Sequence, residues 1–147
     1  MNVKDIMSTN VVTVNEDTTI ENLAKLLIEN QISGVPVVNE GHRLVGIVTE
    51  GDLLHKEIPP RRPEYVGILG GIIYKGLKTY KEDFKKLAAI KASEIMTKRV
   101  VTTTKDSPVE EAASLMVKHK VKRLPVVEGD KIVGIVSRSD IIKNLTE

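Results

Sequence analysis

Two segments of the chain carry apolar residues at the spacing i, i+3, i+4, i+7, i+8, which predicts one buried face of a helix. The first segment has Ile20, Leu23, Ala24, Leu27 and Ile28, and the second has Val109, Ala112, Ala113, Met116 and Val117. Thr18 stands three residues before Glu21, the spacing of a helix-capping box. Ser107 stands in the same relation to Glu110, and Pro108 suits a first helical position. The pattern predicts two helices with matching starts.

Short runs rich in β-branched residues flank the first helical segment and predict strands. "VVTV" at 11–14 precedes it, and "VPVV" at 35–38 and "RLVGIV" at 43–48 follow it as a hairpin with a glycine-containing turn. A last helix is expected after Thr49. The elements therefore follow the order β-α-β-β-α.

The second part of the chain repeats this order almost residue by residue. Residues 3–55 align with residues 92–143, and "LVGIVTEGDLL" matches "IVGIVSRSDII". The offset is 125 − 36 = 89 between Pro36 and Pro125, and it becomes 88 after one extra residue in the first turn. One copy of about 50 residues is too small to bury enough apolar surface alone.

We therefore predict an α/β fold in which two β-α-β-β-α repeats pack about a pseudo-twofold axis and share a core. Repeat 1 is assigned to residues 1–55 and repeat 2 to residues 92–147. Between them lies an insertion, residues 56–91, with a helix expected from about Leu77 to Ala92.

Composition narrows the possible classes of protein. The chain has no Cys, which excludes disulfides, thiolate metal sites and a cysteine nucleophile and suits a reducing compartment. No signal peptide is recognised at the N-terminus. The longest mostly apolar run, residues 65–74, is about half the roughly 20 residues that cross a bilayer. We expect a soluble, cytoplasmic protein without a membrane span.

The charge is concentrated in the insertion. From His55 to Lys91 there are nine Lys or Arg residues and four Asp or Glu, although the whole chain has a net charge of +2. A solvated basic helix is the simpler explanation, and an anionic partner such as nucleic acid is the alternative. Aromatic residues make up only 3% of the chain and no recognition motif is present, so nucleic-acid binding is the weaker hypothesis.

Both repeats contain the spacing S/T-x-x-D, at Thr49 to Asp52 and at Ser137 to Asp140. This spacing is itself a capping box, which stabilises a helix start by about 1 kcal/mol. The same geometry suits a phosphorylated nucleoside. A helix N-terminus attracts phosphate, and a carboxylate accepts hydrogen bonds from ribose hydroxyls. In that interpretation Gly46 and Gly134 permit close approach of a ligand to the backbone, and the prolines interrupt strand pairing.

The ordered motifs "DIM…VVTV…GVPVV…LVGIVTEGD" and "EIM…VVTT…RLPVV…IVGIVSRSD" resemble the CBS domain, named after cystathionine β-synthase. Two copies resemble a CBS pair, or Bateman module, and the resemblance covers residues 3–55 and 92–143, which is 105 of 147 residues. It implies a regulatory module that binds AMP, ADP, ATP or S-adenosylmethionine in clefts between the repeats and transmits the bound state to a protein partner. It also implies a homodimer.

The resemblance assigns ligand-binding roles to equivalent positions of the two repeats. Asp52 and Asp140 would hold ribose hydroxyls, and Thr49 and Ser137 would reach ribose or phosphate. The remaining positions would frame the adenine, complete each cleft or approach phosphates: Thr13, Ser33, Gly34, Val35, Pro36, Thr102, Lys122, Arg123, Leu124 and Pro125. Because Ser33 and Gly34 stand where repeat 2 has Lys122 and Arg123, we expect unequal clefts, and the one that uses Lys122 and Arg123 should suit several phosphates better. Either Asp52 or Asp140 could share that cleft.

Two rival functions remain open. An enzyme is disfavoured because there is no G-x-S-x-G motif and the three histidines lack metal-ligand spacing, so we assign no catalytic or metal-binding residue and no catalytic cofactor. A CBS scaffold that has lost its ligand is the more serious rival, because Asp52 and Asp140 would also be present if they served only as helix caps.

Overall fold

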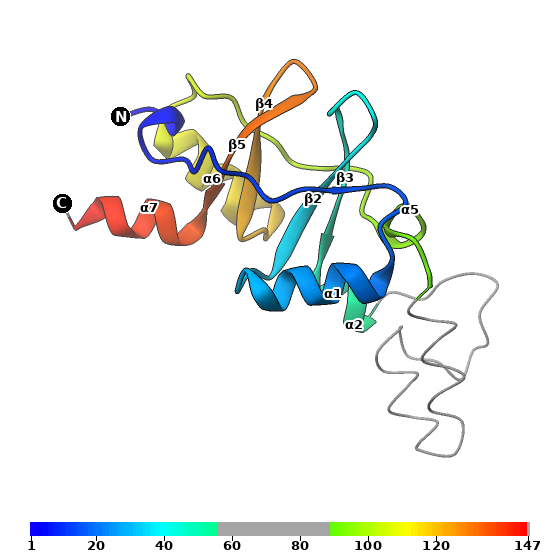
Figure 1. The fold of residues 1–147 in the computed structure, drawn as a ribbon. Helices are drawn as coiled ribbons and strands as arrows, with labels where there is room; N and C mark the ends of the chain where they lie inside the picture. The colour runs from blue at the N-terminus through cyan, green and yellow to red at the C-terminus, as the bar shows by residue number, and fades with distance from the viewer. Residues whose placement is uncertain (56–88, 147) are drawn as a thin grey trace. The chain divides into compact units, whose positions relative to one another are not determined.

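The computed structural model describes residues 1–55 and 89–146 (Figure 1). Most of the insertion, including the helix expected from about Leu77, lies outside the described residues. By their contacts the residues form two compact units. We call Thr13–Glu40 with Val45–Lys98 the repeat-1 unit. The repeat-2 unit consists of Met1–Val12, Gly41–Leu44 and Arg99–Glu147. Each unit therefore contains most of one repeat and the opening residues of the other.

The repeat-1 unit contains a three-stranded sheet in the order β1-β2-β3, with β1 parallel to β2. Its elements are β1 (Val14–Asn15), α1 (Ile20–Glu29), β2 (Gly34–Val38), β3 (Leu44–Thr49), α2 (Glu50–His55) and α5 (Ala92–Ile95). Leu23 and Val35 are fully buried, as are Val37 and Val48, so the apolar side of α1 and the strands form the core. The order β-α-β-β-α is the one that the sequence predicts.

The repeat-2 unit has the same organisation. Its elements are the short 3₁₀ helix η1 (Val3–Asp5), α6 (Val109–His119), β4 (Arg123–Glu128), β5 (Lys131–Ser137) and α7 (Arg138–Leu145). β4 and β5 form an antiparallel hairpin, and Thr103 makes a parallel bridge to Val126 where repeat 1 has β1. In Figure 1 the N-terminus with η1 lies beside α6, and the Ser8 and Ile135 backbones pair at 2.8 and 2.9 Å. The predicted α/β class with two repeats is confirmed.

Glycine in the second hairpin strand makes room for methionine. A Cβ added at Gly46 would stand 2.5 Å from Met96 Sδ, and a Cβ at Gly134 would stand 2.6 Å from Met7 Sδ. In each unit the segment with the repeated "IM" motif packs its methionine side chain against the glycine of this strand. The interpretation that Gly46 and Gly134 admit a ligand is therefore replaced by a packing role.

The helix starts differ from the prediction by one residue. Thr19, and not Thr18, is the N-cap of α1, and its hydroxyl accepts a hydrogen bond from the Asn22 N–H at 3.3 Å. Pro108 is the N-cap of α6 rather than its first residue. Ser107 instead pairs its hydroxyl with that of Thr104 at 2.7 Å. Adjacent residues that can each begin a helix leave the local pattern ambiguous.

The apolar stripes are narrower than predicted. Most of their positions are buried or half-buried, but Ile28 at the end of the first stripe is 76% exposed. Val117, its counterpart in repeat 2, is 79% exposed.

Within residues 1–55 and 89–146 no helix has both the length and the hydropathy needed to span a membrane.

Candidate ligand-binding site

The S/T-x-x-D motif of repeat 1 joins the end of β3 to the start of α2. Asp52 Oδ2 accepts a hydrogen bond from the Thr49 backbone N–H at 2.9 Å, and the Asp52 N–H donates to Thr49 Oγ1 at 3.4 Å. The two bonds form the reciprocal capping box that the spacing predicts. Thr97 adds a third bond, because its hydroxyl donates to Asp52 Oδ1 at 3.1 Å.

The motif of repeat 2 has the same cap at the start of α7. Asp140 Oδ2 accepts from the Ser137 N–H at 2.8 Å, and the Asp140 N–H donates to Ser137 Oγ at 3.2 Å. Within the described part of the chain Asp140 Oδ1 has no hydrogen-bond partner. Ser8, the counterpart of Thr97, is exposed, and among the described residues it forms hydrogen bonds only through its backbone, to Ile135. The two aspartates are therefore held differently, with both oxygens bonded in Asp52 and one available in Asp140.

The residue directly before the first strand of each hairpin is hydrogen-bonded to the first residue of the helix that follows the hairpin. The Ser33 carbonyl accepts the Glu50 N–H at 2.9 Å, and the Lys122 carbonyl accepts the Arg138 N–H at 2.8 Å. Ser33 and Lys122 thereby lie next to the S/T-x-x-D motif of their own repeat. Of these two, Lys122 has an exposed side chain and Ser33 is half-buried.

The strand residues that the resemblance assigns to the adenine are buried. They are Gly34, Val35 and Pro36 in β2 and Leu124 and Pro125 in β4. Arg123, at the start of β4, is half-buried. The expectation that the prolines interrupt strand pairing is wrong for Pro125, which pairs in register with Ile135 and whose carbonyl accepts the Thr103 N–H at 3.0 Å. Its carbonyl is therefore already bonded within the strand layer.

One predicted ligand-binding residue in each repeat directly precedes the first strand of that repeat. Thr13 and Thr102 are both half-buried, and each is followed by a residue that pairs with the hairpin, Val14 in β1 and Thr103 opposite Val126. They therefore occupy equivalent places at the same strand in the two units.

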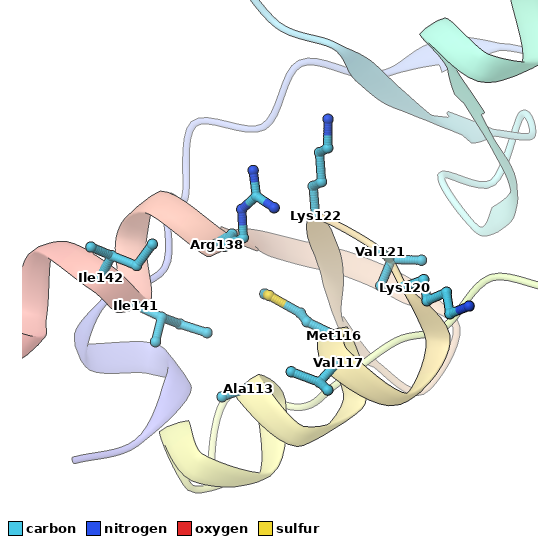
Figure 2. A pocket seen from close by; sticks show the side chains of 9 residues that line it. All are labelled: Ala113, Met116, Val117, Lys120, Val121, Lys122, Arg138, Ile141 and Ile142. Atoms are coloured by element: carbon cyan, nitrogen blue, oxygen red, sulfur yellow. The ribbon is translucent and has the colours of Figure 1, made fainter.

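Two side chains near the motifs were not predicted. Thr97, which binds Asp52, lies 45 residues away in sequence, so local spacing gives no sign of it. Arg138 follows Ser137 inside the motif of repeat 2, and its exposed position beside Lys122 carries a positive charge. Figure 2 shows the Lys122 and Arg138 side chains extending in the same direction from the starts of β4 and α7. Arg138 is the first residue of α7, the helix that Asp140 helps to cap, and its backbone N–H is bonded to the Lys122 carbonyl.

The fold and its two capped helix starts define a protein built from paired β-α-β-β-α repeats. The sequence model of the CBS domain matches residues 3–58 and 92–147, so the chain belongs to the CBS domain family. A relative from Methanocaldococcus jannaschii, the uncharacterized protein MJ1426, is 37% identical over 155 residues, covering 99% of this chain and 91% of that protein.

Two solved structures show the same fold. The CBS domain pair of protein MJ0100, in complex with 5′-methylthioadenosine and S-adenosyl-L-methionine, has a TM-score of 0.71 and 28% identity, and the match covers 99% of this chain and 96% of that one. CBSX2 in complex with AMP has a TM-score of 0.74 and 24% identity, with the same two coverages. The predicted CBS pair is confirmed.

Proposed function

We propose that this CBS pair is a regulatory module that binds an adenosyl compound and acts through binding rather than catalysis. The observation that carries the proposal is Asp140 Oδ1, an acceptor beside a capped helix start with no partner among the described residues. A carboxylate in this position accepts the hydroxyls of a ribose, and cations beside it attract phosphate or a carboxylate. The likeness to a CBS pair that carries 5′-methylthioadenosine and S-adenosyl-L-methionine supports the ligand class.

The two motifs are proposed to differ in affinity. A ribose that binds Asp52 must share or displace the Thr97 hydroxyl, which is already 3.1 Å from Oδ1. A ribose at Asp140 meets no such competitor among the described residues, and Lys122 and Arg138 are joined by a backbone hydrogen bond at the start of the same helix. We therefore expect the motif of repeat 2 to bind first and to favour ligands with more phosphate charge.

The remaining ligand roles are proposed with these two motifs as their centre. The strand residues from Ser33 to Pro36 and from Lys122 to Pro125, together with Thr13 and Thr102, would frame the base and complete the sites. Ligand binding would favour one arrangement of a homodimer, which a protein partner then recognises, as in any population shift.

Calorimetric titration of the purified protein with AMP, ADP, ATP, S-adenosylmethionine and 5′-methylthioadenosine tests the proposal, after any bound nucleotide has been removed. Saturable binding of one compound in the micromolar range is expected. No heat and no thermal shift from any of the five would refute it and leave a CBS scaffold without this ligand. RNA or DNA binding that weakens steeply with salt would instead favour the nucleic-acid hypothesis.

Matched substitutions then separate the two motifs. Asp140→Asn keeps one acceptor oxygen for the helix cap but loses the charge, so we expect affinity to fall about tenfold or more with little loss of stability. Asp52→Asn should lower the affinity for the ligand that binds first, at Asp140, far less. Thr97→Val removes the hydroxyl that competes for Asp52 and should strengthen the weaker site. A large loss of stability with unchanged affinity in Asp140→Asn would restrict this residue to capping.

A further inference from the structure

The two motif aspartates differ in how many hydrogen bonds their carboxylates already accept. Asp52 Oδ2 accepts from the Thr49 N–H at 2.9 Å and from the Thr49 hydroxyl at 3.3 Å. Asp52 Oδ1 accepts from the Thr97 hydroxyl at 3.1 Å. Among the described residues Asp140 accepts only from the Ser137 N–H, at 2.8 Å on Oδ2. Both aspartates are half-buried, so the difference lies in their partners and not in their exposure.

This difference limits how many ligand hydroxyls each carboxylate can accept. An ionised carboxyl group has two oxygens with about four acceptor positions in total. Three donors leave Asp52 at most about one of these positions, and one donor leaves Asp140 about three. The carboxylate of Asp140 can therefore accept two hydroxyls at once, and that of Asp52 cannot.

The hydroxyl of each motif follows the same division. The Thr49 hydroxyl already donates its proton to Asp52. The Ser137 hydroxyl only accepts, from the Asp140 N–H at 3.2 Å, within the described part of the chain. The motif of repeat 2 thus offers a ligand one donor beside its acceptors, whereas the donor of repeat 1 is used within the motif.

Thr97 and its counterpart Ser8 account for part of the asymmetry. Their backbones are equivalent, because Thr97 pairs with Ile47 at 2.8 and 3.0 Å and Ser8 pairs with Ile135 at 2.8 and 2.9 Å. Their side chains are not equivalent, since Thr97 is half-buried and Ser8 is exposed. The branched Thr97 side chain is also restricted at χ1, which helps to hold its hydroxyl on Asp52.

We propose that the motif of repeat 2 selects ligands whose 2′ and 3′ hydroxyls are both present and unmodified, and that the Thr97 hydroxyl removes this selectivity from repeat 1. A ligand that lacks one hydroxyl leaves a part-buried charged acceptor of Asp140 unmatched, which lowers its affinity. A phosphate on either hydroxyl would set like charges against each other. The preferred ligand is therefore a ribonucleoside substituted only at its 5′ position. This inference rests on the proposed function and extends it from the adenosyl group to the ribose.

Calorimetric titration with AMP, 2′-deoxy-AMP and 3′-deoxy-AMP measures the selectivity. The same three forms of 5′-methylthioadenosine or S-adenosylmethionine are used if one of these compounds binds instead of AMP. In Asp52→Asn, where the motif of repeat 2 remains intact, each deoxy analogue should bind roughly ten- to a hundredfold more weakly than its parent compound.

The possible failures of this experiment are distinct. Equal binding of parent and deoxy compounds to Asp52→Asn overturns the selectivity and leaves the adenosyl proposal standing. Loss of all binding in Asp52→Asn, although the wild type binds, also overturns it, because the ligand would then depend on repeat 1. Absence of binding by every parent compound to the wild type is the failure of the proposed function itself.

The complementary variant Asp140→Asn tests the role of Thr97. Only the motif of repeat 1 is then intact, and loss of one ribose hydroxyl should change its affinity less than about threefold. Adding Thr97→Val removes the hydroxyl from Asp52 Oδ1 and should produce a preference of about tenfold for the intact ribose. Adding Thr97→Ser, which keeps a hydroxyl, should produce a smaller preference. If the folded Asp140→Asn, Thr97→Val variant shows no preference or no longer binds, Thr97 does not have this role.

Two controls separate recognition of the ribose from other effects. Ser8→Ala removes a hydroxyl that has no partner among the described residues, so it should leave the selectivity of repeat 2 unchanged. Adenosine 2′,5′-bisphosphate should bind Asp52→Asn more weakly than AMP, although it brings more charge to Lys122 and Arg138. Tighter binding of the bisphosphate would mean that phosphate charge and not the ribose decides, which contradicts the proposal. Circular dichroism reports the folding of every variant.

Discussion

Replacing Gly46 with alanine forces a methyl group into space that Met96 fills. The new Cβ would lie 2.5 Å from Met96 Sδ, 2.8 Å from Cγ and 3.0 Å from Cβ, whereas carbon atoms in contact prefer about 3.5–4.0 Å. Rotation of the Met96 side chain moves the sulfur but not its Cβ. The backbone around it is also fixed, because Thr97 exchanges hydrogen bonds of 2.8 and 3.0 Å with Ile47. The clash must therefore be relieved by a shift of the strand or of the segment that carries Met96.

The size of the effect follows from two opposing contributions. Overpacking a filled site costs about 1–3 kcal/mol. Alanine also restricts the unfolded chain, which offsets about 0.4–1 kcal/mol where the backbone conformation suits it. We expect Gly46→Ala to lower the free energy of unfolding by about 1–2 kcal/mol. At about 2–4 °C per kcal/mol for a chain of this size, the unfolding midpoint should fall by roughly 2–8 °C.

Urea unfolding followed by circular dichroism measures this difference, with Gly51→Ala as the matched control. A Cβ at Gly51 meets nothing nearer than Thr49 Oγ1 at 3.5 Å, and alanine favours a helix over glycine by about 0.5–1 kcal/mol, so this variant should gain stability. In a Met96→Ala background Gly46→Ala should cost much less, because the opposing side chain is gone. Equal costs in both backgrounds would refute the packing role of Gly46.

Three further predictions concern single side chains. The Thr103 hydroxyl is buried without a hydrogen-bond partner among the described residues, so Thr103→Val should raise the free energy of unfolding by about 1 kcal/mol, whereas Thr104→Val, which loses a bonded hydroxyl, should not. Thr19→Ala should cost about 1 kcal/mol as the lost N-cap of α1, and Thr18→Ala should cost less; chemical denaturation measures both pairs. Lys122→Ala should weaken ATP more than AMP in calorimetric titration, since the lost cation matters most to the ligand with more phosphate charge; equal losses would contradict a phosphate contact.

The sequence predicts the order of elements well because two periods, of about two and about 3.6 residues, recur in the same order in both repeats. It predicts the edges of each element less well. Ile28 continues the apolar spacing of α1 yet is exposed, because periodicity gives the direction of a face and not the width of the surface that covers it. Thr18 and Thr19 can each cap a helix, and tertiary packing decides between them.

The site was predictable to the extent that it is local. The three-residue spacing from Ser137 to Asp140 and from Thr49 to Asp52 is sufficient to predict both capping boxes, which the hydrogen bonds confirm. The difference between the two aspartates was not predictable, because it depends on Thr97, which reaches Asp52 only in the folded unit. The ligand-binding roles of these residues remain predictions.

The exchange of opening segments explains why one β-α-β-β-α copy is incomplete. Met7 belongs to repeat 1 by sequence but packs against Gly134 in the hairpin of repeat 2. Met96 opens repeat 2 but packs against Gly46 in the hairpin of repeat 1. In each unit, therefore, the methionine that packs against the strand glycine comes from the other repeat of the same chain. Because the same exchange brings Thr97 to Asp52, the segment that completes the packing of the repeat-1 unit also supplies the hydroxyl that binds Asp52 Oδ1. The proposed difference in ligand affinity between the two motifs therefore depends on the same residues that complete the packing of the repeat-1 unit.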